Sequence, residues 1–325
     1  MLKEQIVSKL RSIRLIRLVA LTFFAVLALP VLAQEKYPSR PIDFIVPWGP
    51  GGGSDQTARK LAKLLESELK VSVPVVNTPG ATGNSGMAKF LSAEANGYTL
   101  CILAWDTYAL LATNPPSWSV KDFVPLGIVI QLPSGFYVAG DHFPNWQAID
   151  REAHARPLKV AISGFGSPDE ITINYLNTKG LKLNAVPFAN PGERYTALLG
   201  GHVDLLYSPA GNVKSFVDGK QMRPVMFFNS GRLAEFPDIP TSKELGYDIT
   251  LPQRRAIIVK AGTDPARIEV LSQALHRVVD TSEYKAFLKD SVALENSYVP
   301  TQQAVTVMQS DLDEMKKIVR ATAKK

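Results

Sequence analysis

Residues 41–65 read PIDFIVPWGPGGGSDQTARKLAKLL, and three local signals follow one another in this stretch. The apolar run at 41–47 predicts a short strand, and the glycine cluster after it predicts a tight turn. Apolar residues at 58, 61, 62 and 65 then recur with the period of an amphipathic helix, for which Ser54 or Asp55 is a natural N-cap. The stretch therefore predicts a strand, a turn and a helix, the repeating unit of an α/β sheet.

The same alternation continues along the chain and restarts after residue 157. Further glycine turns are expected at 79–85 and 164–167. The other expected elements are strands at 71–76, 98–103, 158–163, 186–188, 203–207 and 223–228, helices at 87–91, 169–178, 193–199, 266–279, 283–288 and 302–322, and a short helix opened by Ser208 and Pro209.

Two α/β units in sequence predict an α/β fold with two lobes and mostly parallel sheets. We expect two crossover segments to join the lobes, with residues 126–138 leading out and residues 249–259 returning. The first lobe is then built from residues 34–132 and 255–325, and the second from residues 133–254. Two crossovers of this kind form a hinge with a cleft between the lobes.

The composition is that of a globular protein. The chain has 325 residues, of which 46% are hydrophobic and 20% are charged. This balance excludes a disordered chain, a collagen-like fibre and a membrane protein with many spans. The formal net charge of +6 would by itself suggest an acidic partner such as nucleic acid.

The positive charge is concentrated in residues 1–33, which have the pattern of a secretory signal peptide. This segment holds five basic residues and one acidic residue, followed by an apolar run at 18–29 and small or aliphatic residues at 31 and 33. The run is shorter than the roughly 20 residues of a membrane span, although an uncleaved N-terminal anchor is the alternative. We expect export to the periplasm with cleavage after Ala33, which leaves a net charge of +2 and removes the argument for nucleic acid.

The single cysteine, Cys101, excludes an internal disulfide and any zinc site made from several cysteines. It lies in the apolar run YTLCIL at 98–103, which predicts a buried, unreactive thiol. A catalytic cysteine is the weaker alternative. We expect neither a metal nor a cofactor.

The glycine turns point to anion binding. Each turn follows a strand and precedes a helix, which is where open α/β sheets bind ligands. Free backbone N–H groups and the positive helix end attract an anion there. The turns at 49–55, 81–85 and 164–167 lie on both predicted lobes and therefore favour a carboxylate-binding cleft over plain tight turns.

Enzyme motifs are mostly absent. The sequence GPGGGS at 49–54 has serine where a dinucleotide-binding fingerprint needs its third glycine, and neither a phosphate-binding P-loop nor a nucleophile elbow occurs. The four histidines are scattered and read as surface or packing residues. A Ser-His-Asp triad assembled in space stays open as an alternative.

Two adjacent arginines, Arg254 and Arg255, lie on the returning crossover. Successive side chains of a strand alternate faces, so one guanidinium should point towards the cleft. It could bind a carboxylate through two parallel hydrogen bonds. The alternative is a solvated pair on the surface.

Longer stretches of the chain resemble the TctC/Bug family, the periplasmic solute receptors of tripartite tricarboxylate transporters. The resemblance covers nearly the whole chain after the signal peptide, in order and at the expected spacing. The matching stretches are YPSRPIDFIVPWGPGGGSD at 37–55 with AR at 58–59, VNTPGATGN at 76–84, NGYTL at 96–100, LLGGHVDL at 198–205, PDIPT at 237–241 with ELG at 244–246, and GTDP at 262–265.

The resemblance implies a two-lobed Venus-flytrap fold, a type II periplasmic binding protein, with a carboxylated ligand between the lobes. Backbone amides, short polar side chains and ordered waters would hold that ligand. The implied ligand-binding residues are Trp48, Gly49, Gly51, Gly52, Gly53, Ser54, Asp55, Ala81, Thr82, Gly83, Asn84, Asp106, Thr107, Gly164, Phe165, Gly166, Ser167, Ser208 and Arg255. For Asp55 we favour a helix-capping role over direct ligand contact.

Two departures from the family pattern concern the ligand. Arg255 matches an arginine of the TctC-like subset, but Arg254 and Ala256 replace the tryptophan and glycine around it. The second-lobe turn continues into Asp169 and Glu170 where a His-Leu pair is common. These acids compete with an anionic ligand for the positive helix end. We therefore hypothesise that the second lobe holds its ligand less through charge, and that the ligand carries an amide or amino group there.

The resemblance implies a non-catalytic receptor that closes on a small carboxylate, such as a dicarboxylate or tricarboxylate, and delivers it to membrane permease subunits. A sensory role, in which the closed receptor contacts a membrane kinase, is compatible with transport. The alternative from another class is a periplasmic hydrolase or isomerase on the same fold. We expect a monomer.

Overall fold

The computed structural model describes residues 36–140, 142–294 and 296–323. Contacts divide the chain into two units, Met1–Ser39 and Arg40–Lys325. Within the first unit, residues 36–39 form neither helix nor strand. The predicted signal peptide at 1–33 and its cleavage site lie outside the described residues. Everything that follows concerns the second unit.

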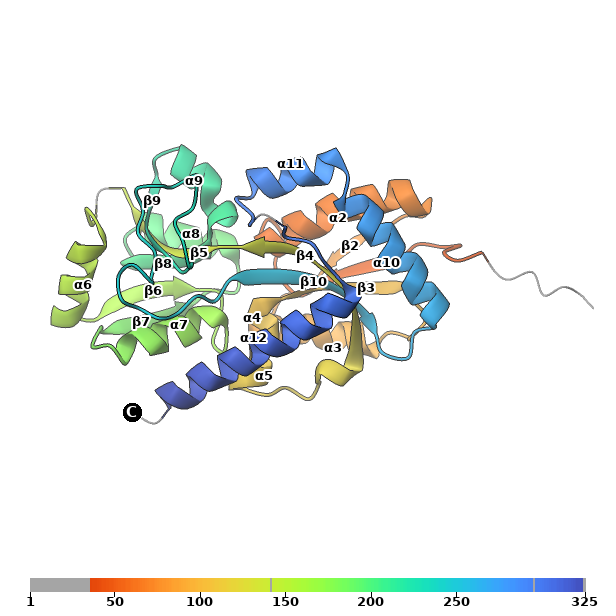
Figure 1. Ribbon diagram of the computed structural model, residues 1–325, viewed down its shortest axis with the longest axis horizontal. Helices are drawn as coiled ribbons and strands as arrows, with labels where there is room; N and C mark the ends of the chain where they lie inside the picture. Colours follow the sequence, from red (N-terminus) through yellow and green to blue (C-terminus); the bar gives the residue numbers. More distant parts are fainter. Residues whose placement is uncertain (1–35, 141, 295, 324–325) are drawn as a thin grey trace, which may run out of the picture. The chain divides into compact units, whose positions relative to one another are not determined.

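A six-stranded sheet forms the core of the first lobe (Figure 1). Its strands, in sheet order, are β11 (Val299–Pro300), β4 (Phe123–Leu132), β10 (Gln253–Lys260), β3 (Thr99–Ala104), β1 (Asp43–Val46) and β2 (Val75–Asn77). β1 runs parallel to β2 and β3, whereas β10 runs antiparallel to β3 and β4. The turns after β1 and β3 therefore open at the same edge of this sheet.

Helices cover this sheet because each has one apolar face. The first, α2 (Gly53–Leu69), buries Ala58, Leu61, Ala62 and Leu65, which confirms the predicted periodicity. Its N-cap is Gly52 rather than Ser54 or Asp55, because the helix begins at Gly53 and both of those residues lie in its first turn. The other helices are α3 (Asn84–Ser92), α4 (Trp105–Tyr108), α5 (Leu110–Thr113), α10 (Pro265–Val279), α11 (Ser282–Asp290) and α12 (Thr301–Thr322), with 3-10 turns η1 (Ala81–Gly83) and η2 (Val120–Asp122).

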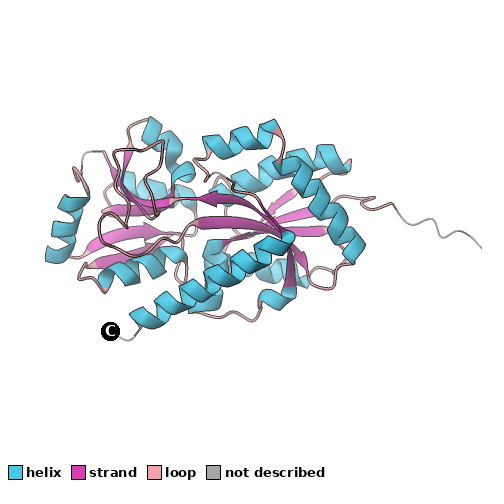
Figure 2. Cartoon of the chain, viewed as in Figure 1, coloured by secondary structure: helices cyan, strands magenta, loops and turns pink. Residues whose placement is uncertain are grey.

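A five-stranded sheet forms the second lobe (Figure 2). Its order is β7 (Leu183–Pro187), β6 (Leu158–Ile162), β8 (Leu205–Pro209), β5 (Ser134–Ala139) and β9 (Met222–Phe227). Its helices are α6 (Trp146–Ala155), α7 (Pro168–Asn177), α8 (Pro191–Leu199) and α9 (Lys214–Asp218), with the 3-10 turn η3 (Ala210–Val213). Ser208 and Pro209 end β8, where they pair with β5, and Pro209 is also the N-cap of η3, so the short helical segment expected after them is present.

The two-lobed α/β fold with crossover segments is confirmed, but the sheets are mixed rather than mostly parallel. β4 ends at Leu132 in the first sheet and β5 begins at Ser134 in the second, while β10 returns through the segment expected at 249–259. These strands run antiparallel to their neighbours, because the chain leaves and re-enters the first lobe in opposite directions. The exact lobe boundaries at 132/133 and 254/255 stay predictions.

The C-terminal helix α12 touches both lobes. It packs against β4 and α5 of the first lobe and against α7 of the second. Its buried face consists of Ala304, Met308, Leu312 and Met315. In Figure 1 this helix runs along the front of both groups of elements. The sequence prediction assigned it to the first lobe alone.

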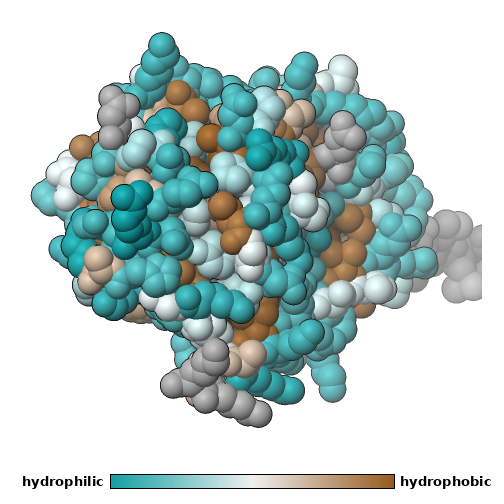
Figure 3. All heavy atoms as spheres, turned by 60° about the vertical axis from the view of Figure 1, so that its left-hand side comes forward, coloured by the Kyte–Doolittle hydropathy of each residue, from teal (hydrophilic) through white to brown (hydrophobic). Residues whose placement is uncertain are grey.

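Cys101 lies fully buried on β3, and burial raises the pKa of its thiol, which confirms an unreactive residue. On the face drawn in Figure 3, apolar side chains appear as separate brown areas among teal polar ones. Among the described residues, the large apolar side chains that stay exposed are Val120, Phe165, Leu199 and Val305, and Phe165 is 50% exposed. None of the described helices is both long and apolar enough to cross a membrane.

Candidate ligand-binding site

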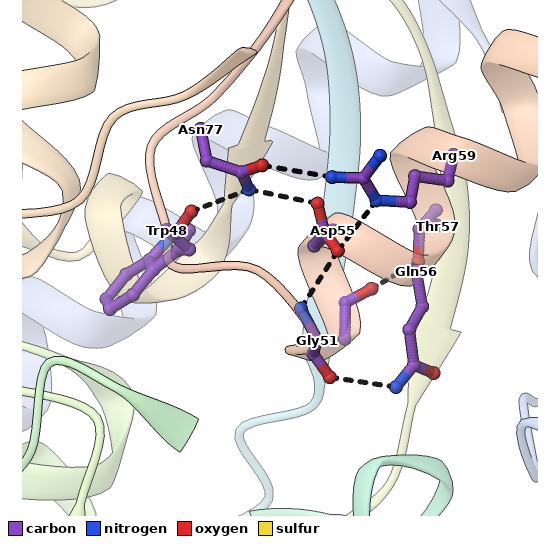
Figure 4. A network of polar contacts seen from close by, with 8 residues as sticks. Trp48, Gly51, Asp55, Gln56, Thr57, Arg59 and Asn77 are labelled. Carbon is purple, nitrogen blue, oxygen red and sulfur yellow. Dashed lines mark hydrogen bonds and ion pairs between the residues drawn. The ribbon is translucent and has the colours of Figure 1, made fainter. Parts of the chain in front are cut away.

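The glycine turn after β1 is held together by Asp55 (Figure 4). Its Oδ2 accepts hydrogen bonds from the Gly51 N–H and from Arg59 Nε, both at 2.9 Å, and its Oδ1 accepts one from Asn77 Nδ2 at 2.9 Å. Burial alone would raise the pKa of Asp55, but these hydrogen bonds outweigh it and lower the pKa below its usual value. Asp55 is therefore ionised and stabilises the turn. Both oxygens of its carboxylate already accept hydrogen bonds within the first lobe.

The same network positions Trp48. Asn77 Nδ2 also donates to the Trp48 carbonyl at 3.0 Å. In Figure 4 the indole ring points away from the Asn77 and Asp55 side chains. The ring is buried, and its Nε1 has no hydrogen-bond partner within the described residues. A buried N–H without an acceptor marks a place where a ligand or water can bind.

Two glycines let this turn approach the second lobe. A Cβ on Gly53 would collide with Asn212 of η3 and with the Arg255 guanidinium. A Cβ on Gly52 would lie 2.7 Å from Pro191 Cγ at the start of α8. Contacts this short do not occur for real Cβ atoms, so a larger residue at either position would force the second-lobe side chains it meets to shift.

The two adjacent arginines of β10 point in opposite directions, as strand alternation predicts. Arg255 is only 6% exposed and donates to Thr57 Oγ1 at 3.1 Å and to Asn212 Oδ1 at 3.2 Å, so it joins α2 to the second lobe. Burial lowers the pKa of Arg255 to about 10, which leaves it charged near neutral pH. Arg254 donates to Gln131 at 2.7 Å and forms an ion pair with Asp311 on α12.

A cavity of about 550 Å³ opens between the two lobes. Six of the predicted site residues line it: Trp48, Ala81, Thr82, Asn84, Gly164 and Phe165. Seven lining residues were missed: Gly80, Leu110, Asn114, Pro116, Ser163, Pro187 and Ala189. The missed residues are mostly apolar or lie in short irregular segments, so neither a polar motif nor a periodicity marks them.

The turns from both lobes meet at this cavity. Thr82 Oγ1 donates to the Phe165 carbonyl at 2.9 Å, and Thr113 Oγ1 donates to the Gly166 carbonyl at 3.0 Å. Ala81 and Thr82 hold positive φ angles of 47° and 53°, which is strained for residues other than glycine. Strained backbone of this kind concentrates at ligand sites and costs about 1–3 kcal/mol per residue.

Backbone N–H groups of the second-lobe turn donate to acidic side chains at the start of α7. Asp169 and Glu170 fall in the first turn of α7, as predicted, and Ser167 is its N-cap. The Glu170 carboxylate accepts from the Gly166 N–H at 2.6 Å, and Asp169 Oδ2 accepts from the Ser163 N–H at 2.9 Å. Two backbone donors of this turn are therefore already occupied by carboxylates of the protein.

A short polar bridge links Asp169 to the first lobe. Ser163 Oγ lies 2.6 Å from Asp169 Oδ2 and 2.5 Å from Asp106 Oδ1 on α4. Burial, and after it the charge of Asp106, raises the pKa of Asp169 to about 7, although Arg194 at 4.0 Å opposes the shift. Within the described residues, Asp169 Oδ1 and Arg194 Nε have no hydrogen-bond partner.

The remaining predicted residues do not line the cavity. Gly83 has a φ of 87°, and a Cβ there would collide with the buried Thr107 hydroxyl. Ser208 is buried in β8 and bonds to the Pro209 carbonyl at 3.3 Å. The others are Gly49, Gly51, Gly52, Gly53, Ser54, Asp55, Asp106, Thr107, Gly166, Ser167 and Arg255. Their role in ligand binding stays a prediction.

The described part of the chain contains no group of three His, Cys, Asp or Glu side chains able to hold a metal ion. The polar groups at the cavity are hydroxyls, amides and backbone N–H groups. Such groups can bind and orient a small anion by hydrogen bonding.

Comparison with known proteins identifies the family of this chain. Residues 57–323 match the model of the family described as tripartite tricarboxylate transporter family receptor. A relative from Cupriavidus necator, the UPF0065 protein in the gbd 5' region, is 31% identical over 85% of this chain and 86% of its own. Protein BugT of Bordetella pertussis is 31% identical over 78% of this chain and 81% of its own.

Two solved structures share the fold. MatC of Rhodopseudomonas palustris with bound malate is 24% identical, covers 87% of this chain and 100% of its own, and superposes with a TM-score of 0.80. An R. palustris protein with adipate is 19% identical, covers 88% of this chain and 98% of its own, and has a TM-score of 0.82. The family consists of solute-binding receptors rather than enzymes, so the hydrolase or isomerase alternative falls away. The chain belongs to the TctC family, the solute-binding receptors of tripartite tricarboxylate transporters.

Proposed function

We propose that this receptor works in the periplasm, captures a small carboxylate between its lobes and delivers it to the permease subunits of a tripartite tricarboxylate transporter. The observation that supports this most is the meeting of two strand-to-helix turns from different lobes on one cavity, through the hydrogen bond from Thr82 to the Phe165 carbonyl. Relatives that share the fold hold malate or adipate.

The backbone of the turns supplies the chemistry for an anion. The first N–H groups of a helix have no acceptor within it, and they lie at its positive end. The start of η1 at the cavity provides such groups from the first lobe, namely the N–H groups of Ala81 and Thr82. The first N–H groups of α3 already bond to the carbonyls of the preceding turn. A carboxylate bound there needs no buried lysine.

Delivery requires export and closure. The basic and apolar pattern of residues 1–33 supports export with cleavage after Ala33, so the mature protein begins at Gln34. The ligand favours the closed arrangement because both lobes contribute to one cavity. We propose lobes of residues 34–132 with 255–325 and of residues 133–254, acting as a monomer and presenting the closed form to the permease.

Native mass spectrometry of the protein purified from the periplasm tests this function. We expect a small organic acid to be retained, and an N-terminus at Gln34. A panel of malate, adipate, citrate and benzoate should then include at least one acid that raises the melting temperature, because a ligand that binds only the folded state stabilises it. No retained molecule and no shift with any acid would contradict the proposal.

Gly53→Ala is a matched test of closure. Its new Cβ would displace the Asn212 amide and the Arg255 guanidinium, which hydrogen-bond across the lobes, so the rise in melting temperature should become smaller. Gly231→Ala is the control, because a Cβ there has no atom of the described residues within 4 Å. Equal binding by both variants would show that the contact at Gly53 is not part of capture.

A further inference from the structure

We infer that the ligand is a monocarboxylate with a flat apolar body, bound with its carboxylate at the first-lobe turn 81–84 and its body against Phe165 and Trp48. This inference rests on the proposed function and specifies the class of acid. It follows from the free hydrogen-bond donors and the negative charges that lie on the two sides of the cavity.

No charged side chain of the described residues lines the cavity. A carboxylate taken out of water must be compensated by hydrogen bonds or an opposite charge. The first-lobe side offers the backbone N–H groups of Ala81 and Thr82 at the start of η1. It also offers Asn84 Nδ2, because Asn84 Oδ1 already accepts from Trp118 Nε1 at 2.7 Å. One carboxylate can therefore be accommodated on this side.

The second-lobe side disfavours another carboxylate. Its turn donors at Ser163 and Gly166 already bond to Asp169 and Glu170. Glu170 brings a negative charge to the helix end that would otherwise attract the ligand, and like charges repel. A second carboxylate at the start of α7 would therefore find no free backbone N–H at Ser163 or Gly166.

The other walls of the cavity are mostly apolar, with the Asn114 amide as a polar group among them. They are formed by Leu110 and Pro116 from the first lobe and by Pro187 and Ala189 from the second. Phe165 adds a ring that is 50% exposed at the cavity, and Trp48 adds an indole whose N–H has no partner among the described residues. An aromatic ring placed against them would bury apolar surface and gain about 0.5–1.5 kcal/mol from ring contacts.

Isothermal titration calorimetry of the full mature protein with benzoate, cyclohexanecarboxylate, succinate and adipate tests this class. We expect benzoate to bind at least about tenfold more tightly than succinate or adipate, with cyclohexanecarboxylate between them. Tighter binding of succinate or adipate would overturn the inference and leave the proposed function intact. Failure of all four acids, together with no retained ligand, would instead remove the proposed function.

Phe165→Ala separates the ring contact from the carboxylate contact. It should weaken benzoate binding by about tenfold and change any measurable succinate binding less than twofold. Leu199→Ala is the control, because Leu199 is exposed on α8 away from the cavity lining. An equal loss for both acids in Phe165→Ala would assign the residue to closure and contradict ring recognition.

The bridge between Asp106, Ser163 and Asp169 carries a second, independent inference. We propose that contact between the lobes takes up one proton on this bridge. A serine hydroxyl has one proton to donate, yet Ser163 Oγ lies within 2.6 Å of a carboxyl oxygen on each side. An ionised carboxylate only accepts hydrogen bonds, so one of the two carboxyl groups must itself donate.

Asp169 is the group that holds this proton. It is 2% exposed, and the groups that face it are Asp106 from α4, Arg194 from α8 at 4.0 Å and the Tyr207 hydroxyl from β8. Burial and Asp106 raise its pKa to about 7 despite Arg194. When the lobes separate, Asp106 leaves Ser163, whose hydroxyl can then donate to an ionised Asp169.

Small-angle scattering of the ligand-free protein measures this coupling without a ligand. We expect the radius of gyration to fall between pH 8.5 and pH 5.5 at constant ionic strength, because acid favours the contact. Asp169→Asn should show the same radius at both pH values, because the substitution removes the group that takes up the proton. Ser163→Ala should show no pH dependence.

Asp290→Asn is the control for a general effect of removing an acid, because Asp290 lies at the exposed end of α11. It should behave as the unmodified protein. A radius that does not change with pH in the unmodified protein, or a change that persists in Asp169→Asn, would overturn the proton bridge.

Discussion

At the scale of single residues, Arg255 and Arg254 show how one strand serves two purposes. Arg255 joins Thr57 to Asn212 across the lobes, whereas Arg254 pairs with Asp311 on α12. We expect Arg255→Ala to weaken carboxylate binding more than about tenfold, because it removes the bonds to Thr57 and Asn212 that hold the lobes together, and hydrogen bonds from a charged donor are worth about 1.5–3 kcal/mol. Calorimetry with the tightest acid of the panel measures this loss.

Arg254→Ala is the matched control for that prediction. It should lower the melting temperature while changing the affinity less than twofold, because its guanidinium faces α12. Arg255→Lys should recover only part of the affinity, since an ammonium cannot reproduce the two directed bonds of the guanidinium. A change below twofold in Arg255→Ala would show that its bonds between the lobes do not contribute to carboxylate binding.

The residues that could be predicted from the sequence are those with a local signature. Glycine and short polar residues at the strand-to-helix turns led to Ala81, Thr82 and Gly164, which line the cavity. Walls such as Leu110 and Pro187 could not be predicted, because an apolar side chain at a cavity looks like any other core residue in sequence. Ser163 could not be predicted either, because it bonds to Asp106 of the other lobe and the sequence separation of the two residues does not indicate this contact.

At the scale of elements, α12 is fastened to the first lobe through Asp311. This carboxylate accepts from Trp105 Nε1 at 2.7 Å and pairs with Arg254, and both members of the pair are 16% exposed. Asp311→Asn would leave Arg254 partly buried without its counter-charge, so we expect the free energy of unfolding to fall by about 1–3 kcal/mol. Urea unfolding measures this loss.

Asp313→Asn is the control on the same helix, because Asp313 is exposed and bonds to Gln309 one turn away. It should change the free energy of unfolding by less than about 0.5 kcal/mol. Equal losses in the two variants would mean that the Trp105 and Arg254 contacts add nothing to the docking of α12.

Elements with a long, regular pattern could be predicted well. α2, α10 and α12 follow from their apolar periodicity, and the glycine turns mark where helices begin. α4 and α5 have four residues each, too few to show a period. The antiparallel pairing of β10 could not be predicted either, because strand direction depends on how the chain returns to the first lobe.

At the scale of the whole molecule, two buried aspartates give stability opposite dependences on pH. The pKa of Asp169 is raised in the folded protein, so the folded state holds its proton where the unfolded chain has lost it. Its contribution to stability therefore increases as pH falls from about 7 towards the ordinary value of 3.8. The pKa of Asp55 is lowered, so its contribution is present above its ordinary value and is lost on further acidification.

These signs predict opposite behaviour for two matched variants. Asp169→Asn should gain stability relative to the unmodified protein as pH rises from 5 to 8, by up to about 1.4 kcal/mol per pH unit, because it removes the cost of ionising a buried acid. Asp55→Asn should instead be less stable than the unmodified protein across this range, since an amide cannot replace an ionised carboxylate that accepts from Gly51, Arg59 and Asn77. Urea unfolding of the three proteins at several pH values measures both differences. If the difference between Asp169→Asn and the unmodified protein were the same at pH 5 and pH 8, Asp169 would have to be ionised throughout, and one hydroxyl could not then bond to both of its carboxylate neighbours.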